Sequence, residues 1–189
     1  NIGFMWLFVE PMIFTLGVAL LWSLAGAHHE SPLPIVAFAV TGYSSVLLWR
    51  NMPNRCVSAI EPNLSLMYHR NVKVIDIFLS RLILEALGAT ASFLVLSVVF
   101  ISIGVMSLPY DLLKVVFGWL MLTWFGFSLA LIVGSLGIYS EVVERIWHPM
   151  MYFLFPLSGA AYMVEWLAKD IQSARLWLPM VNGTELLRE

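Results

Sequence analysis

Long apolar segments without a single charged side chain are the feature that most constrains the fold of this chain. Five of them carry no Asp, Glu, Lys or Arg: residues 11–27, 31–49, 86–110, 115–140 and 149–164. A helix of about 20 apolar residues crosses the hydrocarbon core of a bilayer. Charged residues form only 12% of the chain, about half the share of a soluble domain. The sequence therefore predicts an all-α, polytopic helical membrane protein with five spans, the third of which starts near Val74.

The remaining charges lie between the apolar segments, and their sign predicts the orientation of the chain. Residues 50–73 contain four Lys or Arg residues, whereas residues 27–34 contain none and residues 107–114 contain one. Positively charged loops stay in the cytoplasm. We therefore expect residues 50–73 and 139–148 inside, and residues 27–34, 107–114 and 165–189 outside. The last segment mixes Trp and Leu with charges and is expected to form short interfacial or re-entrant helices.

The larger cytosolic element, residues 50–73, contains the start of a candidate short helix from Pro62 to Asp76. In such a helix Leu64, Met67 and Tyr68 would share one face at i, i+3, i+4 spacing. An exposed apolar face of this kind suits a protein partner. The alternative is an interfacial helix that lies among the lipid headgroups.

The smaller cytosolic element, residues 139–148, places Glu141, Glu144 and Arg145 on a helix-like turn before Pro149. A charged turn is in most proteins simply a solvated surface. Two cytosolic elements in one small membrane chain are, however, also the arrangement through which a partner can drive a transporter from below.

The sequence lacks the residues that several kinds of chemistry need. The chain has no GxxxxGK[ST] phosphate-binding loop, so it cannot hydrolyse ATP by a P-loop mechanism. Cys56 is the only cysteine, which excludes an intrachain disulfide. His28, His29 and Glu30 lack further ligands at metal-binding spacing, and a net charge of −2 gives no footprint for nucleic acid. We therefore expect no catalytic, cofactor or metal site and no nucleic-acid partner.

Four blocks, in chain order, carry a family resemblance: "NIGFMWLFVEP", "AIEPNLSLMYHRNVKVIDIFLSRLILE", "GWLMLTWFGFSLALIVG" and "SEVVERIWHPMMYFLFPLSGA". Together they resemble the permease subunit of bacterial capsular-polysaccharide ABC exporters, which belong to the ABC-2 class. The resemblance covers nearly the whole chain. The blocks at residues 60–85 and 139–160 are specific in combination.

The resemblance implies a multi-pass permease of the bacterial inner membrane that moves a lipid-linked capsular polysaccharide and is not itself an enzyme. The family has six membrane helices per permease, two permease copies side by side as a homodimer, and separate ATP-binding subunits that hold ATP and Mg²⁺. Periplasmic and outer-membrane export proteins are further partners that the resemblance suggests. Residues 1–189 would then be a fragment, one transmembrane domain whose sixth span and N-terminal amphipathic helix lie beyond its ends.

In this family the loop after the second span carries a coupling helix that fits a groove on the ATPase. The resemblance maps that helix onto residues 61–73 and a shorter contact onto residues 139–147. The residues expected to couple the permease to its ATPase are Glu61, Pro62, Leu64, Met67, Tyr68, His69, Arg70, Lys73, Glu141, Glu144 and Arg145.

The implied cargo draws attention to aromatic residues in the first two spans, because sugar faces stack on aromatic rings. The residues expected to form the glycan path or its gate are Trp6, Phe8, Glu10, Phe14 and Tyr43. For each aromatic residue, lipid contact or core packing is the alternative. A carboxylate inside a span needs a polar surrounding, so Glu10 either gates the cytosolic mouth or pairs with Arg50 or Arg55.

Two packing features are also predicted. Arg81 and Glu85 are four residues apart and can pair on one helix face. Small residues at helical spacing indicate close contacts between membrane helices. These small residues are Gly88, Ala89, Ala91, Ser92, Gly126, Ala130 and Gly134.

Other functions stay open at this point. A related permease would export O-antigen or teichoic acid instead of capsule. A membrane-embedded glycan-modifying enzyme, such as a glycosyl or acyl transferase, needs a cluster of polar residues at one depth, and only Glu10 lies well inside a span. A secondary transporter should show interrupted helices in both halves with charges at the midplane, for which Pro11 and Pro156 are the only hints.

Overall fold

A computed structural model of the chain describes residues 2–24, 34–69, 71–160 and 177–188. These residues form helices and short connections, with no strand among them. The helices are α1 (Ile2–Leu24), α2 (Ile35–Val57), the 3₁₀ turn η1 (Glu61–Asn63), α3 (Leu64–His69), α4 (Val74–Ser102), α5 (Leu112–Tyr139), α6 (Glu141–Leu157) and α8 (Pro179–Leu186). The all-α class expected from the sequence is confirmed for this part of the chain. His28, His29 and Glu30 lie outside it.

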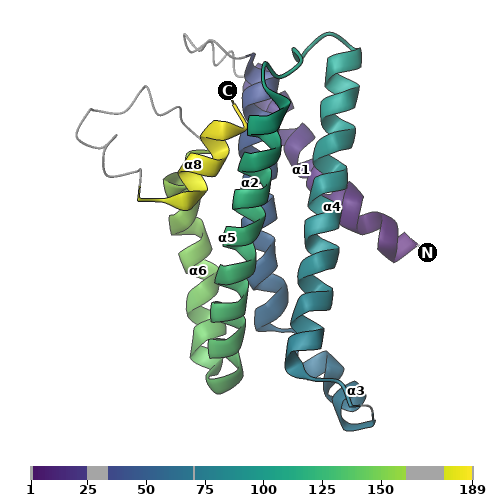
Figure 1. Cartoon of the computed structure of the whole chain (residues 1–189), viewed down its shortest axis with the longest axis vertical. Coiled ribbons are helices and arrows are strands. Elements are labelled where there is room, and N and C mark those ends of the chain that lie inside the picture. The colour runs from purple at the N-terminus through teal and green to yellow at the C-terminus, as the bar shows by residue number, and fades with distance from the viewer. Residues whose placement is uncertain (1, 25–33, 70, 161–176, 189) are drawn as a thin grey trace.

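Four long helices run alternately down and up a single bundle (Figure 1). α2 descends, α4 rises, α5 descends and α6 rises, whereas α1 crosses the bundle obliquely toward an N-terminus beyond α4. η1, α3 and the junction of α5 with α6 lie at the lower end, and the α4–α5 turn and α8 lie toward the upper end. The two elements predicted to be cytosolic therefore share one end, opposite the α4–α5 turn predicted to be external.

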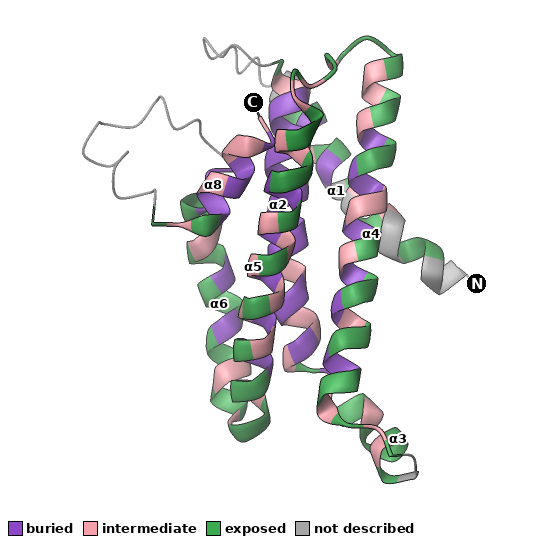
Figure 2. Cartoon of the chain, viewed as in Figure 1, coloured by how far each residue is buried: buried purple, intermediate pink, exposed green. Residues whose placement is uncertain are grey.

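α2 is the buried centre of the bundle. It contacts α1, α4, α5, α6 and α8, and every residue from Ala37 to Trp49 is buried (Figure 2). A helix that is surrounded on all sides cannot expose its polar side chains to water, so they must bond internally. The Thr41 hydroxyl accordingly donates to the Ala37 carbonyl at 2.7 Å.

Glycines on α5 allow that helix to lie close against α2. A Cβ atom at Gly126 would come within 2.7 Å of Met52 Sδ and 3.0 Å of Trp49 Cα, closer than non-bonded carbon contacts normally approach. A Cβ atom at Gly134 would meet the Cys56 side chain at 2.9 Å. The close helix contacts predicted from the small residues of this segment are confirmed.

α4 and α5 present apolar side chains to the outside of the bundle. Exposed large residues include Leu87, Leu94 and Val98 on α4 and Phe117, Leu120 and Trp124 on α5. Contiguous apolar surface of this kind is unfavourable in water and suits the hydrocarbon of a bilayer. Within the described part of the chain, α4 and α5 are the two helices that are long and apolar enough to cross a membrane.

α1 continues through Pro11 toward the N-terminus, so that Glu10 lies inside a helix as expected. Two helices extend past the boundaries predicted from charge and proline. α2 runs to Val57, so that its last turns occupy the start of the loop predicted at residues 50–73. α6 begins at Glu141, ahead of the predicted start at Pro149. Proline interrupts isolated helices, but helices of membrane proteins tolerate it because neighbouring groups satisfy the freed backbone.

Candidate functional site

The two predicted cytosolic elements meet at one open cleft at the lower end of the bundle. The cleft has a volume of about 590 Å³ and is lined by Glu61 of η1 and by Glu141, Glu144, Arg145 and His148 of α6. Three carboxylates face one guanidinium there, so the cleft is negative at neutral pH. Residues far apart in the sequence thus form a single surface, which we call the acidic cleft.

η1 and α3 are held against the bundle by specific contacts. Pro62 lies at the start of η1, where its missing N–H costs no hydrogen bond. Asn63 Nδ2 donates to the Ala59 carbonyl at 2.8 Å, and Met67 packs against the main core. These contacts fix Glu61 at the edge of the acidic cleft.

The outer side of α3 exposes apolar side chains. Leu64 and Tyr68 are 56% and 87% exposed, and their i, i+4 spacing places them on one face. Met67, which is expected to share that face, packs against the core instead. The side chain of His69 and the whole of Arg70 lie outside the described residues.

Both helices that rise from the lower end begin with capping contacts. At the start of α4 the Lys73 N–H donates to Asp76 Oδ2 at 2.9 Å. At the start of α6 the Ser140 hydroxyl oxygen accepts from the Val142 N–H at 3.3 Å. These caps fix where Lys73 and Glu141 leave the bundle, and both side chains are exposed.

The charged residues of α6 form a solvated helix start. Glu141 Oε2 and Arg145 Nη2 are 3.7 Å apart, with side chains 88% and 80% exposed. An ion pair as exposed as this adds little to stability. Glu141 and Glu144 lie in the first turn, where the helix dipole favours carboxylates. Their charge therefore stays available to a partner.

His148 is the residue of the acidic cleft that sequence reasoning misses. A helix that starts at Pro149 leaves His148 in a turn, whereas the observed α6 starts at Glu141 and includes it. His148 Nδ1 lies 2.9 Å from the Glu144 carbonyl oxygen, one helical turn earlier. The i, i+4 spacing of Glu144 and His148 is the signal that an earlier helix start would have shown.

Glu10 pairs with Arg55, one of the two partners expected for it. Arg55 Nη2 lies 3.5 Å from Glu10 Oε2, and Arg55 Nε donates to Glu85 Oε2 at 3.1 Å. We call these three residues the Arg55 cluster. The pair expected between Arg81 and Glu85 is replaced by this contact, because Glu85 is only 5% exposed and faces the arginine of α2.

The aromatic candidates for a path differ in accessibility. Trp6 on α1 is 56% exposed. Tyr43 on α2 is buried, and its ring centroid lies 5.6 Å from that of Phe155 on α6. The side chains of Phe8 and Phe14 lie outside the described residues. Within this one chain, Tyr43 therefore follows the core-packing alternative, and Trp6 is open to a ligand or to lipid.

α8 lies within the segment predicted at residues 165–189 and packs against α5 and α2. The Thr184 and Ser45 hydroxyl oxygens are 3.3 Å apart, and Thr184 is 0% exposed. α8 is therefore packed inside the bundle, and the expectation of interfacial or re-entrant helices stays a prediction. Residues 165–176 lie outside the described part of the chain.

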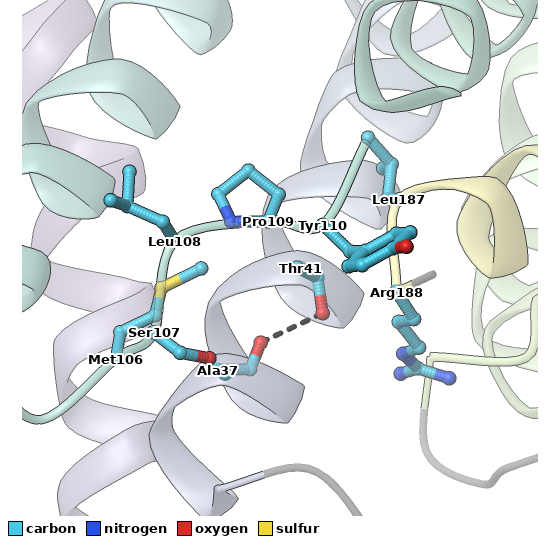
Figure 3. Close-up of a pocket in the computed structure, with 9 residues that line it drawn as sticks. All are labelled: Ala37, Thr41, Met106, Ser107, Leu108, Pro109, Tyr110, Leu187 and Arg188. Carbon is cyan, nitrogen blue, oxygen red and sulfur yellow. Dashed lines mark hydrogen bonds between the residues drawn. The ribbon is translucent and has the colours of Figure 1, made fainter. Parts of the chain in front are cut away.

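A small pocket of about 170 Å³ opens beside the end of α8, next to the turn that joins α4 to α5 (Figure 3). Its lining residues are Ala37, Thr41, Met106, Ser107, Leu108, Pro109, Tyr110, Leu187 and Arg188. Arg188 Nη1 and Nη2 donate to the carbonyls of Gly159 and Ala160 at 2.8 Å and 2.9 Å, and its guanidinium lies 4.0 Å from the centroid of the Phe38 ring. Arg188 thus ties the end of α8 to α2 and to the end of α6.

Comparison with known proteins gives matches that cover the whole of this chain. The capsule polysaccharide export inner-membrane protein CtrC of Neisseria meningitidis serogroup B is 43% identical over 188 residues, which cover 100% of this chain and 71% of the relative. BexB of Haemophilus influenzae, which carries the same description, is 39% identical over 188 residues with the same coverage. The polysialic acid transport protein KpsM of Escherichia coli is 26% identical over 192 residues, covering 100% of this chain and 73% of the relative. No protein-family model matches.

Proposed function

We propose that this chain is the membrane-spanning permease subunit of an ABC-2 exporter of capsular polysaccharide. The chain belongs to the family of capsule polysaccharide export inner-membrane proteins. The observation that carries the proposal is the match to two such proteins along the whole chain, at 43% and 39% identity. The names of these relatives describe export, which supports a transport subunit rather than an enzyme. They also favour capsule over O-antigen or teichoic acid as the cargo.

In this proposal the bundle spans the bacterial inner membrane with five helices and its lower end faces the cytosol. The positive residues of segment 50–73 support that orientation. The apolar outer faces of α4 and α5 support contact with lipid. Two copies of the permease side by side would enclose a path for the lipid-linked glycan, with Trp6 and Glu10 at its cytosolic side.

The energy for export would come from a separate ATP-binding subunit that holds ATP and Mg²⁺, because the chain has no phosphate-binding loop. What supports docking from below is that both candidate contact elements border the same cleft. A groove with basic residues would complement the acidic cleft, and an apolar patch would cover Leu64 and Tyr68. The proposed contact residues are Glu61, Pro62, Leu64, Tyr68, His69, Arg70, Lys73, Glu141, Glu144, Arg145 and His148.

A double variant tests the docking surface in the complex of the permease with its ATP-binding subunit. Glu61→Gln with Tyr68→Ala removes one carboxylate of the acidic cleft and the most exposed apolar side chain of α3. We expect association at least about fivefold weaker, because a buried aromatic contact is typically worth over about 1 kcal/mol. The matched control is Tyr110→Ala, since Tyr110 is 98% exposed at the opposite end.

The measurements are copurification of the ATP-binding subunit and the amount of surface polysaccharide in cells. The double variant should lose both, while the protein stays in the membrane and the control retains both. Association and export equal to those of Tyr110→Ala would contradict docking at this surface.

A further inference from the structure

One guanidinium connects three helices near the lower end of α2. Arg55 on α2 contacts Glu85 on α4 through Nε at 3.1 Å and Glu10 on α1 through Nη2 at 3.5 Å. α1 also packs against both α2 and α4, which it crosses at an angle (Figure 1). The Arg55 cluster is thus an ionic link between α1 and the α2–α4 pair.

The two contacts of Arg55 are unequal. The Glu85 side chain is 7% exposed, whereas that of Glu10 is 47% exposed. A buried carboxylate that loses its partner keeps the full cost of desolvation. A half-exposed carboxylate can be solvated by water when the pair opens, and such pairs contribute little. The Glu10–Arg55 contact is therefore the one that can open and close at small cost.

α1 buries few of its described residues. Among its residues whose exposure the structure describes, only Thr15 and Ala19 are buried. Its exposed large residues include Met5, Trp6, Ile13, Leu16 and Leu21. α2, by contrast, is surrounded along most of its length (Figure 2). α1 thus has fewer buried side chains than α2 to hold it in place.

Arg55 lies in the last turn of α2, directly before the segment that leads to the acidic cleft. α2 ends at Val57, and Asn63 of η1 bonds back to the Ala59 carbonyl at 2.8 Å. A displacement of Glu61 by a docked partner therefore reaches Arg55 through a short connection that is itself hydrogen-bonded.

We propose that Arg55 is a positioning residue that transmits movement of the docking surface to α1. In each transport cycle the Glu10–Arg55 contact opens, while the Glu85–Arg55 contact persists and keeps α2 and α4 together. Because α1 carries Trp6 and Glu10, its movement opens the cytosolic side of the path. The inference rests on the proposed function, since the displacement has to come from an ATP-binding subunit below.

Distances between spin labels test this in the complete complex in lipid nanodiscs, with labelled permease diluted by unlabelled copies. Met5→Cys with Leu87→Cys reports on α1 relative to α4, and the two native side chains are 63% and 61% exposed. Asn51→Cys with Leu87→Cys is the matched control for α2 relative to α4, because Asn51 lies within α2 and is partly exposed. The native Cys56 is 0% exposed and does not compete for label. ATP should shift the first distance and leave the second unchanged.

Two substitutions then address the Arg55 cluster without any need for ATP. Glu10→Gln removes the exposed contact. It should raise the ratio of molecules in which α1 has moved away to molecules in which α1 is held at Arg55 by up to about fivefold. Arg55→Lys should act in the same direction, because a single ammonium cannot reproduce the two-sided contact of a guanidinium. An unchanged first distance in both variants overturns the inference. An ATP-driven shift as large in the control pair as in the first pair also overturns it.

The design separates this inference from the proposed function. An ATP-binding subunit that fails to associate would refute docking, whereas the Glu10→Gln and Arg55→Lys comparisons would still decide the role of Arg55. A complex that forms and exports while the first distance stays fixed with ATP would refute the role of Arg55 alone.

Discussion

Replacing Gly118 on α5 with alanine tests how α8 is held in the bundle. A Cβ atom at this position would lie 2.8 Å from the carbonyl oxygen of Gly183 and 2.9 Å from Leu186 Cβ. Real Cβ atoms essentially never approach other atoms this closely. Both contacted atoms are fixed to the backbone of α8, so no side-chain rotation can relieve the clash. α8 as a whole has to move away from α5.

The size of the effect follows from two opposing terms. Overpacking of a close contact costs about 1–3 kcal/mol, and replacing a helical glycine with alanine returns up to about 1 kcal/mol. The net loss of up to about 2 kcal/mol would raise the population with α8 displaced by as much as about thirtyfold. Gly17→Ala on α1 is the matched control, because a Cβ atom there meets nothing within 4 Å.

The assay is the rate at which Thr184→Cys is modified by a membrane-impermeant maleimide. Thr184 is 0% exposed when α8 packs against α5, so modification reports displacement of α8. We expect faster modification with Gly118→Ala than with Gly17→Ala, each combined with Thr184→Cys. Equal rates in the two backgrounds would refute the packing of α8 on α5 at Gly118.

Two further substitutions test contacts at the α4–α5 side of the bundle, each by thermal unfolding in detergent. Trp119→Phe keeps an aromatic ring stacked near Phe93 but removes the indole N–H that donates to Thr90 Oγ1 at 2.8 Å. The free energy of unfolding should therefore fall by about 1 kcal/mol, and an unchanged unfolding midpoint would contradict the hydrogen bond. Asp111→Ala removes the oxygen that accepts from the Leu113 N–H at 2.9 Å and should cost about 0.5–2 kcal/mol. Asp111→Asn should retain most of that stability, and a loss equal to that of alanine would count against the cap.

The fold class follows from the sequence because long uncharged segments leave few alternatives to helices in a bilayer. The small residues Gly126 and Gly134 also predict the close approach of α5 to α2. The ends of the helices are harder to predict, because charged residues and proline are taken as helix boundaries although a helix can continue past both. α2 continues past Arg55 since Glu85 on α4 and Glu10 on α1 lie there to accept its charge.

The candidate site is predictable in its parts and not in its assembly. Charge and periodicity indicate residues 61–73 and 139–148 as separate elements, but no local signal places Glu61 and Glu144 on the same cleft. That arrangement depends on how α2, α5 and α6 pack, which is set by the whole bundle. The same limit applies to Glu85, whose nearest opposite charge along its own helix is Arg81 and whose actual partner lies on α2.

The central claim is that this chain moves polysaccharide only when a separate ATP-binding subunit docks beneath it. The most direct measurement is uptake of purified lipid-linked capsular polysaccharide into sealed proteoliposomes, with and without the ATP-binding subunit and Mg-ATP outside. The account predicts ATP-dependent uptake with both proteins and none with the permease alone. Sustained, directional uptake by the permease alone, at the rate of the full complex, would contradict it.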